Sequence, residues 1–583
     1  MEEEKIFKVR HSLAHILAMA ILRKFPDAKL GVGPVIENGF YYDFLLPEKI
    51  SDADLAGLEK EMKKIVKEKI EFKKSIASRT DALEEVKKTE QNFKTELIND
   101  LPENEELSFY QSGEFKDLCR GPHVSDSSEI NSEAFCLTHL AGAYWRGDEK
   151  RETLTRVYGL AFESKEELEA HLKMLEEAKK RDHRVLGKQL DLFTFSELVG
   201  PGLPLWTPKG TLIRQELDAF IWQLRSQYDY QKVTIPHITK KDLYEVSGHW
   251  QKFSEELFKI NTREGHEFAM KPMNCPHHTQ IYNHLPRSYR DLPQRYAETT
   301  MVYRDEQSGE LSGLSRVRCI TQDDAHVFCR EIQVKEEVLK IVKIIQTFYQ
   351  AFGFELKIRL SLHDPAQMEK YLGDEETWKK TENDLRELLN SAKLEFSEGL
   401  GEAAMYGPKI DFMAQDSIGR GWQVATIQLD RNLPERFDLF CNNEQGEQER
   451  IVMIHAAIAG SLERFTSVLI EHLAGDFPLW LSPVQIKILT VSENHVEFSQ
   501  NLAQEFKLAG LRVEIDDSNE TLGNKIRKNS AEKIPYTLVI GDREINSQEL
   551  AVRVRGQKDL LNIDKEKFIQ SSLEKIKNRD LNL

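Results

Sequence analysis

The sequence has few cysteines and no long hydrophobic run. Six cysteines in 583 residues are too sparse for a disulfide scaffold, so each is a candidate buried thiol, metal ligand or nucleophile. The opening MEEEKIFKVR is acidic where a signal peptide is basic and then apolar, and no stretch of about 18 apolar residues follows it. We therefore expect a cytoplasmic protein with no membrane segment.

Positive charge is also in deficit. The sequence has 80 basic and 97 acidic residues, a net charge of −17, which argues against coating nucleic acid by bulk charge but permits a local basic site. Residues 484–583 are balanced, with 16 basic and 16 acidic residues, so the acidic excess lies upstream. This neutral segment is the better candidate for docking a polyanion.

The length predicts several domains, about four at ~150 residues each. Residues 1–163 mix a helical pattern (HSLAHILAMAIL), a strand pattern (GVGPVIENGFYYDF) and a charged helical segment from Asp52 to about Ser75, which indicates an α+β domain. Residues 164–188 are charged and free of proline, and predict a solvated connector helix. The Pro/Gly-rich LVGPGLPLWTPKG opens a long segment, 189–481. Residues 482–583 alternate strands and helices, as in an α/β domain with a largely parallel sheet.

Two patterns in the long segment suggest phosphate binding. The string TTMVYRDEQSGELSGLSRVRCITQDDAHVF predicts an antiparallel hairpin, with Arg304 and Glu306 leaving the first strand on one face and Arg316 entering the second. An arginine can hold a phosphate bidentately and a carboxylate can accept from an adenine amino group, although surface arginines also pair with neighbouring acids. Further on, IVMIHAAIAGSLERF predicts a strand, a turn at Gly460 and a helix with Arg464 near its phosphate-favouring start.

These strings resemble the motifs of the class II aminoacyl-tRNA synthetases: VTIPHI ending motif 1 around Pro236, VYRDE through RVR as motif 2, and GSLERF as motif 3. KPMNCP, TQDDAHVF, MYGPKIDF, WQVATIQLD and VMIHAAIAGSLERF are similar to the bacterial threonyl-tRNA synthetase family, from about Arg10 to the C-terminus. The resemblance implies an α+β multidomain enzyme with an N-terminal α+β editing domain, a catalytic domain on an antiparallel sheet and a C-terminal α/β anticodon-binding domain. It also implies a homodimer that joins L-threonine to tRNA(Thr) at the expense of ATP.

The resemblance further implies roles in the catalytic domain. Catalysis would depend on Arg304, Arg464, Lys409 and Gln322. ATP, with magnesium, would be bound by Arg304, Glu306, Arg316, Gln423, Thr426 and Arg464, and threonine by Asp324, Tyr406, Gln428 and Ser461. One zinc ion per subunit would be held by Cys275, His326 and His455. No spacing rule identifies these residues as ligands, and taken alone they suggest a buried thiol and two hydrogen-bonded histidines. An apolar pocket separates threonine poorly from isosteric valine, so a zinc ion that binds the amino and hydroxyl groups makes the hydroxyl obligatory.

Serine also has an amino group and a hydroxyl, so a zinc ion cannot reject it. It lacks only the methyl group of threonine, which is worth about 1–3 kcal/mol, so a hydrolytic second site is expected. His11 and His15 stand at i and i+4 on one helical face, and Cys119 and His123 lie in DLCRGPHV; taken alone, these pairs suggest either zinc ligands or satisfied histidines. The resemblance instead assigns them, with Asp117, to an editing site that hydrolyses seryl-tRNA without a metal.

In the C-terminal domain the resemblance places anticodon contacts at Asn519, Arg527, Glu544 and Arg553, where polar groups can read unstacked bases; each is otherwise an ordinary surface residue. Two positions depart from the family pattern. Ile320 stands where a phenylalanine usually stacks on adenine, and His277 where a glycine usually follows KPMNCP. Because the editing motif begins at Arg10, we expect a shortened form without the small N-terminal ubiquitin-like domain.

Two other functions fit parts of the sequence. A non-catalytic RNA-binding relative would typically lose motif arginines or zinc ligands, and all are present here. A metallohydrolase built on the two His and Cys pairs would leave the activation site unexplained. An enzyme that ligates threonine to tRNA is therefore the prediction.

Overall fold

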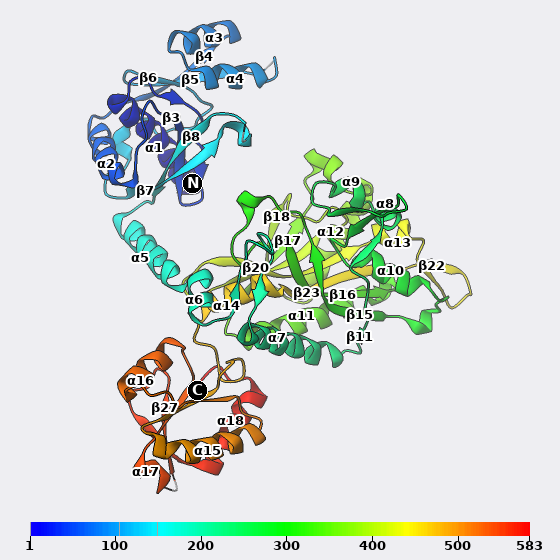
Figure 1. Ribbon diagram of the computed structural model, residues 1–583. Coiled ribbons are helices and arrows are strands. Elements are labelled where there is room, and N and C mark those ends of the chain that lie inside the picture. Colours follow the sequence, from blue (N-terminus) through cyan, green and yellow to red (C-terminus); the bar gives the residue numbers. More distant parts are fainter. Residues whose placement is uncertain (1, 104, 149, 548) are drawn as a thin grey trace. The chain divides into compact units, whose positions relative to one another are not determined.

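The chain forms two compact units, Met1–Glu176 and Glu177–Leu583, and each is described by itself (Figure 1). The computed structural model describes residues 2–103, 105–148, 150–547 and 549–583. Among those residues, no helix is both long and apolar enough to cross a bilayer.

The first unit has a sheet covered by two helices. The sheet runs in the order β1 (Lys29–Leu30), β3 (Gly39–Leu45), β8 (Thr153–Ala161) and β7 (Phe135–Tyr144), with β2 (Val35–Ile36) paired to β3. Phe40, Tyr42 and Phe44 alternate along β3 and are buried in a core with α1 (Glu2–Lys24) and α2 (Asp52–Lys67), because alternate residues of a strand share one face.

A second, smaller sheet completes this unit. It contains β4 (Phe72–Ala77), β5 (Leu107–Ser112) and β6 (Phe115–Leu118), beside α3 (Arg79–Lys88) and α4 (Asn92–Asp100). The helix predicted to run to about Ser75 is therefore too long. It ends at Lys67, because Lys69 takes a positive φ of 55° that a right-handed helix does not contain, and the chain then enters β4.

The predicted connector helix is two helices. α5 (Lys165–Arg181) and α6 (His183–Gln189) are separated by Asp182, whose φ of −49° and ψ of 121° are not helical. The Asp182 side chain accepts a hydrogen bond from the Arg184 N–H, so it caps the second helix and thereby ends the first. The sequence pattern missed this break because an aspartate in a charged run resembles any other surface residue.

The second unit is built on an eight-stranded sheet. Its order is β11 (Gln231–Lys232), β15 (Gln294–Tyr303), β16 (Cys319–Cys329), β23 (Val452–Ser461), β20 (Gly421–Asp430), β19 (Lys409–Gln415), β17 (Glu355–Leu362) and β18 (Phe396–Leu400). Only the two outermost pairs are parallel; the rest are antiparallel. The predicted antiparallel catalytic sheet is confirmed.

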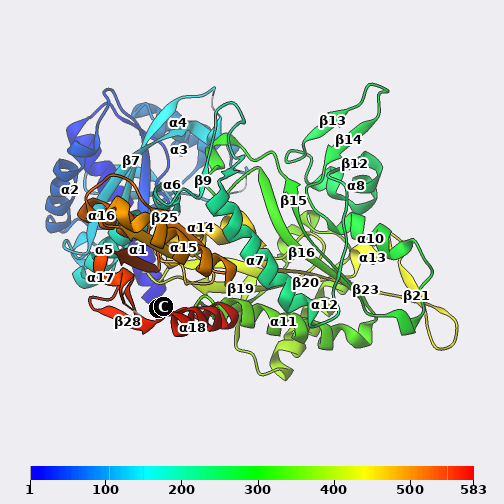
Figure 2. The same cartoon turned by 60° about the horizontal axis from the view of Figure 1, so that its bottom comes forward.

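Helices cover one face of this sheet and leave the other for the site. α7 (Pro208–Ser226), α11 (Val334–Gln350) and α14 (Leu462–His472) share one large core with the sheet, and Figure 2 shows α7 and α11 in front of the sheet in that view. On the opposite face, α10 (Cys275–Asn283) packs on β16. Smaller elements surround the sheet: β9 (Phe193–Thr194), β10 (Leu205–Trp206), β12 (Ile238–Lys240), α8 (Lys241–Ser247), α9 (His249–Lys252), β13 (Lys259–Asn261), β14 (Glu267–Met270), α12 (Glu375–Ser391), α13 (Asn432–Arg436), β21 (Phe440–Asn442) and β22 (Gln448–Arg450).

Strand register brings distant residues into rows on the open face. His326 of β16 lies opposite His455 of β23, which lies opposite Gln428 of β20, which in turn lies opposite Lys409 of β19. Two residues along each strand, the next row contains Asp324, Ala457, Thr426 and Asp411. Because the side chains of a strand alternate between faces, both rows point to the same side.

The last hundred residues form a five-stranded sheet in the order β25 (Val513–Asp516), β24 (Ile486–Thr490), β26 (Tyr536–Ile540), β27 (Glu549–Val554) and β28 (Leu560–Asp564). α15 (Val496–Leu508), α16 (Leu522–Ala531), α17 (Asp542–Ile545) and α18 (Lys565–Asn578) connect or follow these strands. The first three strands in this order are parallel, and β27 and β28 are antiparallel. The α/β class is as predicted, with a mixed rather than largely parallel sheet.

Candidate functional site

A cavity of about 500 Å³ opens on the free face of the catalytic sheet, within the usual range for small-ligand pockets. Its lining includes every residue assigned to ATP by the resemblance: Arg304, Glu306, Arg316, Gln423, Thr426 and Arg464. Gln322, Ser461 and Ile320 line it as well. Residues 160 positions apart in the chain therefore meet in one ligand-sized space, and isoleucine supplies an apolar wall where phenylalanine was expected.

The arginines of this cavity repel one another. Burial lowers the pKa of Arg464, and the nearby charge of Arg316 lowers it further. Arg304 Nε is buried, and no partner for it lies among the described residues. Clustered and incompletely paired guanidinium groups are suited to an anionic ligand such as a polyphosphate.

Arg316 does not enter the second strand, as the sequence pattern predicted. β16 begins only at Cys319, and Arg316 lies in the preceding loop, where it donates to Glu306 Oε2 at 2.8 Å and to Glu310 Oε2 at 3.0 Å. The loop forms a turn closed by a bridge between Ser312 and Arg316, so the second strand begins later in the sequence than predicted. The alternative of an arginine paired with neighbouring acids thus describes this conformation, although both Arg316 and Glu306 face the cavity.

Asp411 organises one wall of the cavity. This buried carboxylate accepts hydrogen bonds from Gln423 Nε2 at 2.8 Å, Thr426 Oγ1 at 3.0 Å and Ser361 Oγ at 2.7 Å. Lys409 is absent from the cavity lining, and its ammonium lies 3.2 Å from Asp411 Oδ2. Asp411 was not predicted from the sequence, although it belongs to the string MYGPKIDF and lies two residues after Lys409, on the same face of the strand.

Cys275, His326 and His455 meet on the same face, with one ligand atom of each within 4.8 Å of the others. His326 Nε2 and His455 Nδ1 are 3.1 Å apart, so the two rings turn these nitrogens toward a common point. The far nitrogen of His455 lies 2.8 Å from Asp430 Oδ2. A thiol and two imidazoles, with a carboxylate orienting one ring, are donors that suit zinc and leave a coordination position open for a substrate.

Two residues beside Cys275 also contact this group. His278 Nδ1 lies 2.7 Å from His326 Nδ1, and Asn274 Nδ2 donates to Asp324 Oδ2 at 3.0 Å. Both are fully buried. The sequence reasoning did not select them, although Cys275 and His278 at i and i+3 share a helical face.

Among the other residues predicted to bind threonine, Tyr406 and Gln428 lie beside the same three side chains, whereas Ser461 lies farther along β23. The Tyr406 ring stacks on His455, with ring centroids 4.8 Å apart, and its hydroxyl donates to Gln428 Oε1. Ser461 caps α14 by accepting from the Arg464 N–H at 3.2 Å. The row of His326, His455 and Gln428 explains why residues this far apart meet.

His277, the departure from the family pattern, is buried beside this group. Both of its ring nitrogens lack a partner among the described residues, and burial lowers its pKa to about 4. It is therefore a neutral imidazole at pH 7. Its ring centroid lies 6.2 Å from that of Tyr244, so the side chain fills space between α10 and α8.

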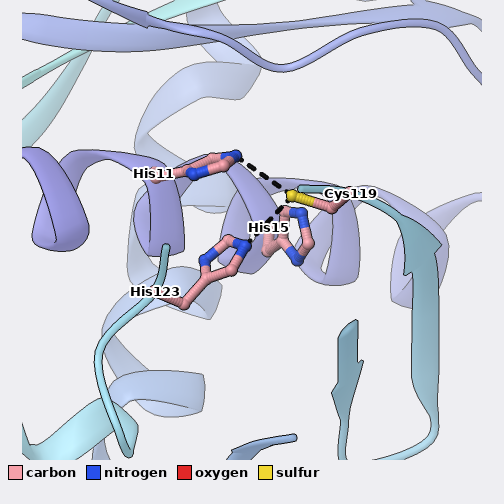
Figure 3. A group of neighbouring side chains, drawn as sticks. All are labelled: His11, His15, Cys119 and His123. Atoms are coloured by element: carbon pink, nitrogen blue, oxygen red, sulfur yellow. Dashed lines mark hydrogen bonds between the residues drawn. The ribbon is translucent and has the colours of Figure 1, made fainter. Parts of the chain in front are cut away.

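In the first unit, His11, His15, Cys119 and His123 converge (Figure 3). The histidines at 11 and 15 come from α1, and the other two residues follow β6. Cys119 Sγ lies 3.2 Å from His11 Nε2 and 3.2 Å from His123 Nε2. Gly121 permits the turn between them, because its φ is 74° and a Cβ there would lie 2.3 Å from the Tyr110 hydroxyl.

Burial dominates the electrostatics of this cluster. It lowers the pKa of all three histidines and raises the pKa of the Cys119 thiol to about 11. At neutral pH the four groups are therefore uncharged, because removing water disfavours their ionised forms.

Asp117 supplies the nearby charge. Its carboxylate lies 2.8 Å from Lys94 Nζ and accepts a hydrogen bond from the Tyr42 hydroxyl, while His15 Nε2 lies 4.0 Å away. Lys94 and Tyr42 were not identified from the sequence. Tyr42 shares the alternating face of Phe40 and Phe44, which was a usable signal, whereas Lys94 is one lysine of a charged helical stretch.

The four predicted anticodon residues lie on separate elements within the last hundred residues. Arg527 and Arg553 are exposed on α16 and β27, and Asn519 is exposed after β25. Glu544 Oε2 accepts from the Gly541 N–H at 3.0 Å and so caps α17. Within the part of the chain that the structure describes, no hydrogen bond or ion pair joins any two of the four.

Comparison with known proteins identifies three regions. Residues 258–473 match the tRNA synthetase class II core domain (G, H, P, S and T), residues 485–575 an anticodon binding domain, and residues 107–158 the threonyl and alanyl tRNA synthetase second additional domain. The threonine–tRNA ligase of Porphyromonas gingivalis is 49% identical over 94% of this chain and 84% of its own length. That of Clostridium tetani is 46% identical over 99% and 89%. A crystal structure of the RNA binding domain of threonyl-tRNA synthetase from Cryptosporidium parvum matches 67% of this chain and 98% of its own, at 38% identity and a TM-score of 0.64.

Proposed function

Because this chain belongs to the threonine–tRNA ligase family, we propose that it selects threonine with a zinc ion held by Cys275, His326 and His455, and that its first unit hydrolyses seryl-tRNA(Thr). The family membership makes it a class II aminoacyl-tRNA synthetase, an enzyme that charges tRNA in an ATP-dependent reaction and has an editing domain. The convergence of the three ligand side chains beside the cavity is the observation that carries the proposal.

Activation takes place in the cavity. Arg304 and Arg464 hold the α-phosphate from two sides, and Arg316 exchanges its contacts with Glu306 and Glu310 for the outer phosphates. Glu306, released from that pair, accepts from the adenine amino group. A threonine carboxylate oxygen then attacks the α-phosphorus in line as pyrophosphate leaves, and the fixed cations stabilise the developing charge. Magnesium would enter with ATP and would supply further positive charge beside Arg304, Arg316 and Arg464.

The chain's own residues hold the amino acid beside this cavity. Zinc, when bound, provides a Lewis acid that can accept both the amino and the hydroxyl group of threonine. Asp324, fixed by Asn274, receives the ammonium side, and the Tyr406 hydroxyl, fixed by Gln428, closes the pocket over His455. A terminal ribose hydroxyl of the tRNA then attacks the activated carbonyl carbon, and AMP leaves.

In the first unit, Cys119, His123 and the neighbouring histidines position water against the ester of seryl-tRNA, while Asp117 and Lys94 bind the serine side. Serine differs from threonine only by a missing methyl group, so the activation site of the second unit can discriminate against serine by only about 1–3 kcal/mol. The anticodon is read by Asn519, Arg527, Glu544 and Arg553.

The active form is a homodimer. Apolar side chains are exposed just ahead of α7, at Phe195, Leu198, Val199 and Leu205, and a second copy would cover them.

The most informative test is pyrophosphate exchange by the full chain with threonine, serine and valine. We expect exchange with threonine, weaker exchange with serine and almost none with valine. Cys275→Ser should abolish the threonine-dependent exchange and lower the zinc content, whereas Cys136→Ser, in the first unit, should change neither. Exchange that persists in both Cys275→Ser and zinc-stripped protein would remove the zinc from the proposal.

A further inference from the structure

The cluster of Figure 3 has one more potential metal ligand than the cluster around Cys275. His11, His15, Cys119 and His123 each place one donor atom within 4.8 Å of the other three. A three-ligand set leaves a position for substrate, whereas four protein donors complete the tetrahedral shell of zinc. Nitrogen and sulfur donors also disfavour magnesium and calcium, which prefer oxygen.

Two histidine rings of this cluster are oriented by polar groups that contact the ring nitrogen farther from Cys119. His11 Nδ1 lies 3.1 Å from the Pro122 carbonyl oxygen, which only accepts, so Nδ1 has the proton and the Nε2 lone pair faces Cys119 Sγ. His123 Nδ1 lies 3.1 Å from Ser12 Oγ, which leaves Nε2 facing the same sulfur. A hydrogen bond on the far nitrogen that aims the near one is the arrangement found at protein metal sites.

The fourth donor is buried and unpaired. His15 is 2% exposed, and its Nδ1 has no partner among the described residues. By contrast, Asp182, His183 and Glu471 also lie together, but His183 Nδ1 bonds to Glu471 Oε1 at 2.6 Å and its Nε2 accepts from the Leu314 N–H at 3.0 Å. Both ring nitrogens of His183 are therefore paired, whereas in the cluster at Cys119 the Nδ1 atom of His15 is not.

We propose that a thiophilic divalent ion of the zinc class binds His11, His15, Cys119 and His123 and thereby switches off hydrolysis in the first unit. The inference rests on the proposed editing function. The same Cys119 and His123 cannot position water while both ligate an ion, and a shell filled by four protein donors leaves no site for water on the metal. The ion is thus an inhibitor of this site and a cofactor of the other.

The binding step has a defined proton balance. The Cys119 S–H bond breaks, one metal–sulfur and three metal–nitrogen bonds form, and one proton passes to solvent. Because a metal-bound cysteine is a thiolate and a metal-bound histidine is a neutral imidazole, the thiol provides the proton that is released.

The test uses the full chain with Cys275→Ser, so that no thiolate remains in the other cluster. Titration with cobalt as the probe should give one equivalent bound, with the absorption bands of a tetrahedral cobalt–thiolate centre and release of one proton. Adding Cys119→Ser should remove the thiolate band and weaken binding by at least ~10-fold. Adding Cys136→Ser, a half-buried cysteine of the same unit, should leave the band in place. Thermal unfolding of each variant confirms that it is folded.

Hydrolysis of preformed seryl-tRNA is then followed in the wild-type chain. With chelator present it should proceed, and zinc should suppress it by at least ~10-fold over the range in which cobalt binds, while magnesium should not. A missing thiolate band with intact hydrolysis overturns the metal site alone. Faster hydrolysis with zinc overturns the inhibitory role. No hydrolysis in either condition contradicts the editing function, and the switch with it.

Discussion

Glu463 accepts two hydrogen bonds from Thr321: the threonine N–H donates to Oε2 and its hydroxyl to Oε1, each at 2.7 Å. Arg214 donates to the same hydroxyl at 2.6 Å. The three residues come from α14, β16 and α7, so one threonine joins the helix of the GSLERF motif to a central strand and to a helix on the covered face of the sheet. Its chain neighbour Gln322 and the neighbour of Glu463, Arg464, both line the cavity.

Thr321→Val should therefore impair activation. Valine has the shape of threonine and retains the N–H bond to Glu463, but the hydroxyl that links Arg214 to Glu463 is lost. Leaving such groups unpaired costs about 1–3 kcal/mol, and we expect kcat for threonine-dependent pyrophosphate exchange to fall ~10-fold with a smaller change in KM for threonine. Thr347→Val, which removes a hydroxyl that donates to the Lys343 carbonyl within one helix, is the matched control. Equal activity of both variants would show that the junction is merely structural.

Asp430→Asn should weaken zinc binding. His455 Nε2 lies 2.8 Å from Asp430 Oδ2, and loss of such a partner lowers metal affinity ~10–100-fold. Asparagine retains Oδ1, which accepts from the N–H groups of Asn432 and Leu433, so the start of α13 remains capped. Chelator competition measures the affinity, with Asp438→Asn on the exposed surface as control. An unchanged zinc affinity would exclude Asp430 from orienting the ligand.

Lys94→Met should reduce seryl-tRNA hydrolysis and leave threonine activation intact. The substitution strands the buried Asp117 carboxylate, which costs about 3–5 kcal/mol, so the first unit should also melt earlier. Lys94→Met with Asp117→Asn removes the stranded charge and should recover the melting temperature without recovering hydrolysis. Recovery of both would assign this pair to stability alone.

Acidification should destabilise the second unit through His472. Burial lowers the pKa of His472, and its Nδ1 accepts from the Ser417 N–H at 3.0 Å. A histidine whose folded pKa lies below the unfolded value binds fewer protons when folded, so stability is lost as the pH falls below about 6.5. His472→Asn retains an acceptor that does not titrate. The difference in Tm between pH 7.5 and 5.5 should be smaller in the variant than in the wild type; an identical difference contradicts the assignment.

Arg527→Ala should raise the KM for tRNA and leave ATP-dependent threonine activation unchanged. Arg527 is exposed on α16, and among the described residues its side chain bonds only to Asn524 of the same helix, so its loss should not unfold the sheet. Aminoacylation kinetics and pyrophosphate exchange separate the two steps, with Lys507→Ala as an exposed control. A parallel loss in both reactions would mean that Arg527 supports the fold.

The sequence was informative wherever a residue's role follows from its position along a strand. Gln322, Asp324 and His326 alternate on one strand, so the motif that contains them also fixes the face on which they lie. Resemblance predicted the ligand and cavity residues for the same reason. Confirmed features include the antiparallel catalytic sheet and the helix that follows Gly460.

The rest depended on packing that one strand or helix does not encode. Asp411 gains its role from side chains on neighbouring strands, and Lys94, on α4, from a carboxylate on β6. Arg316 and Asp182 show that element boundaries are also hard to predict from composition. Loop geometry placed the start of β16 after Arg316, and a helix cap at Asp182 divided the predicted connector helix into α5 and α6. Side chains that orient other side chains, such as Asn274 and His278, are the class most easily missed.

The pairing of β16 with β23 sets an order of events for the nascent chain. His326 and His455, which are 129 positions apart, become neighbours only when these strands join, and closing so long a loop is slow. β15 and β16, in contrast, form a local hairpin that can arise early. The predicted metal ligands thus come together after this hairpin, so an ion bound to them would report that β16 and β23 have paired.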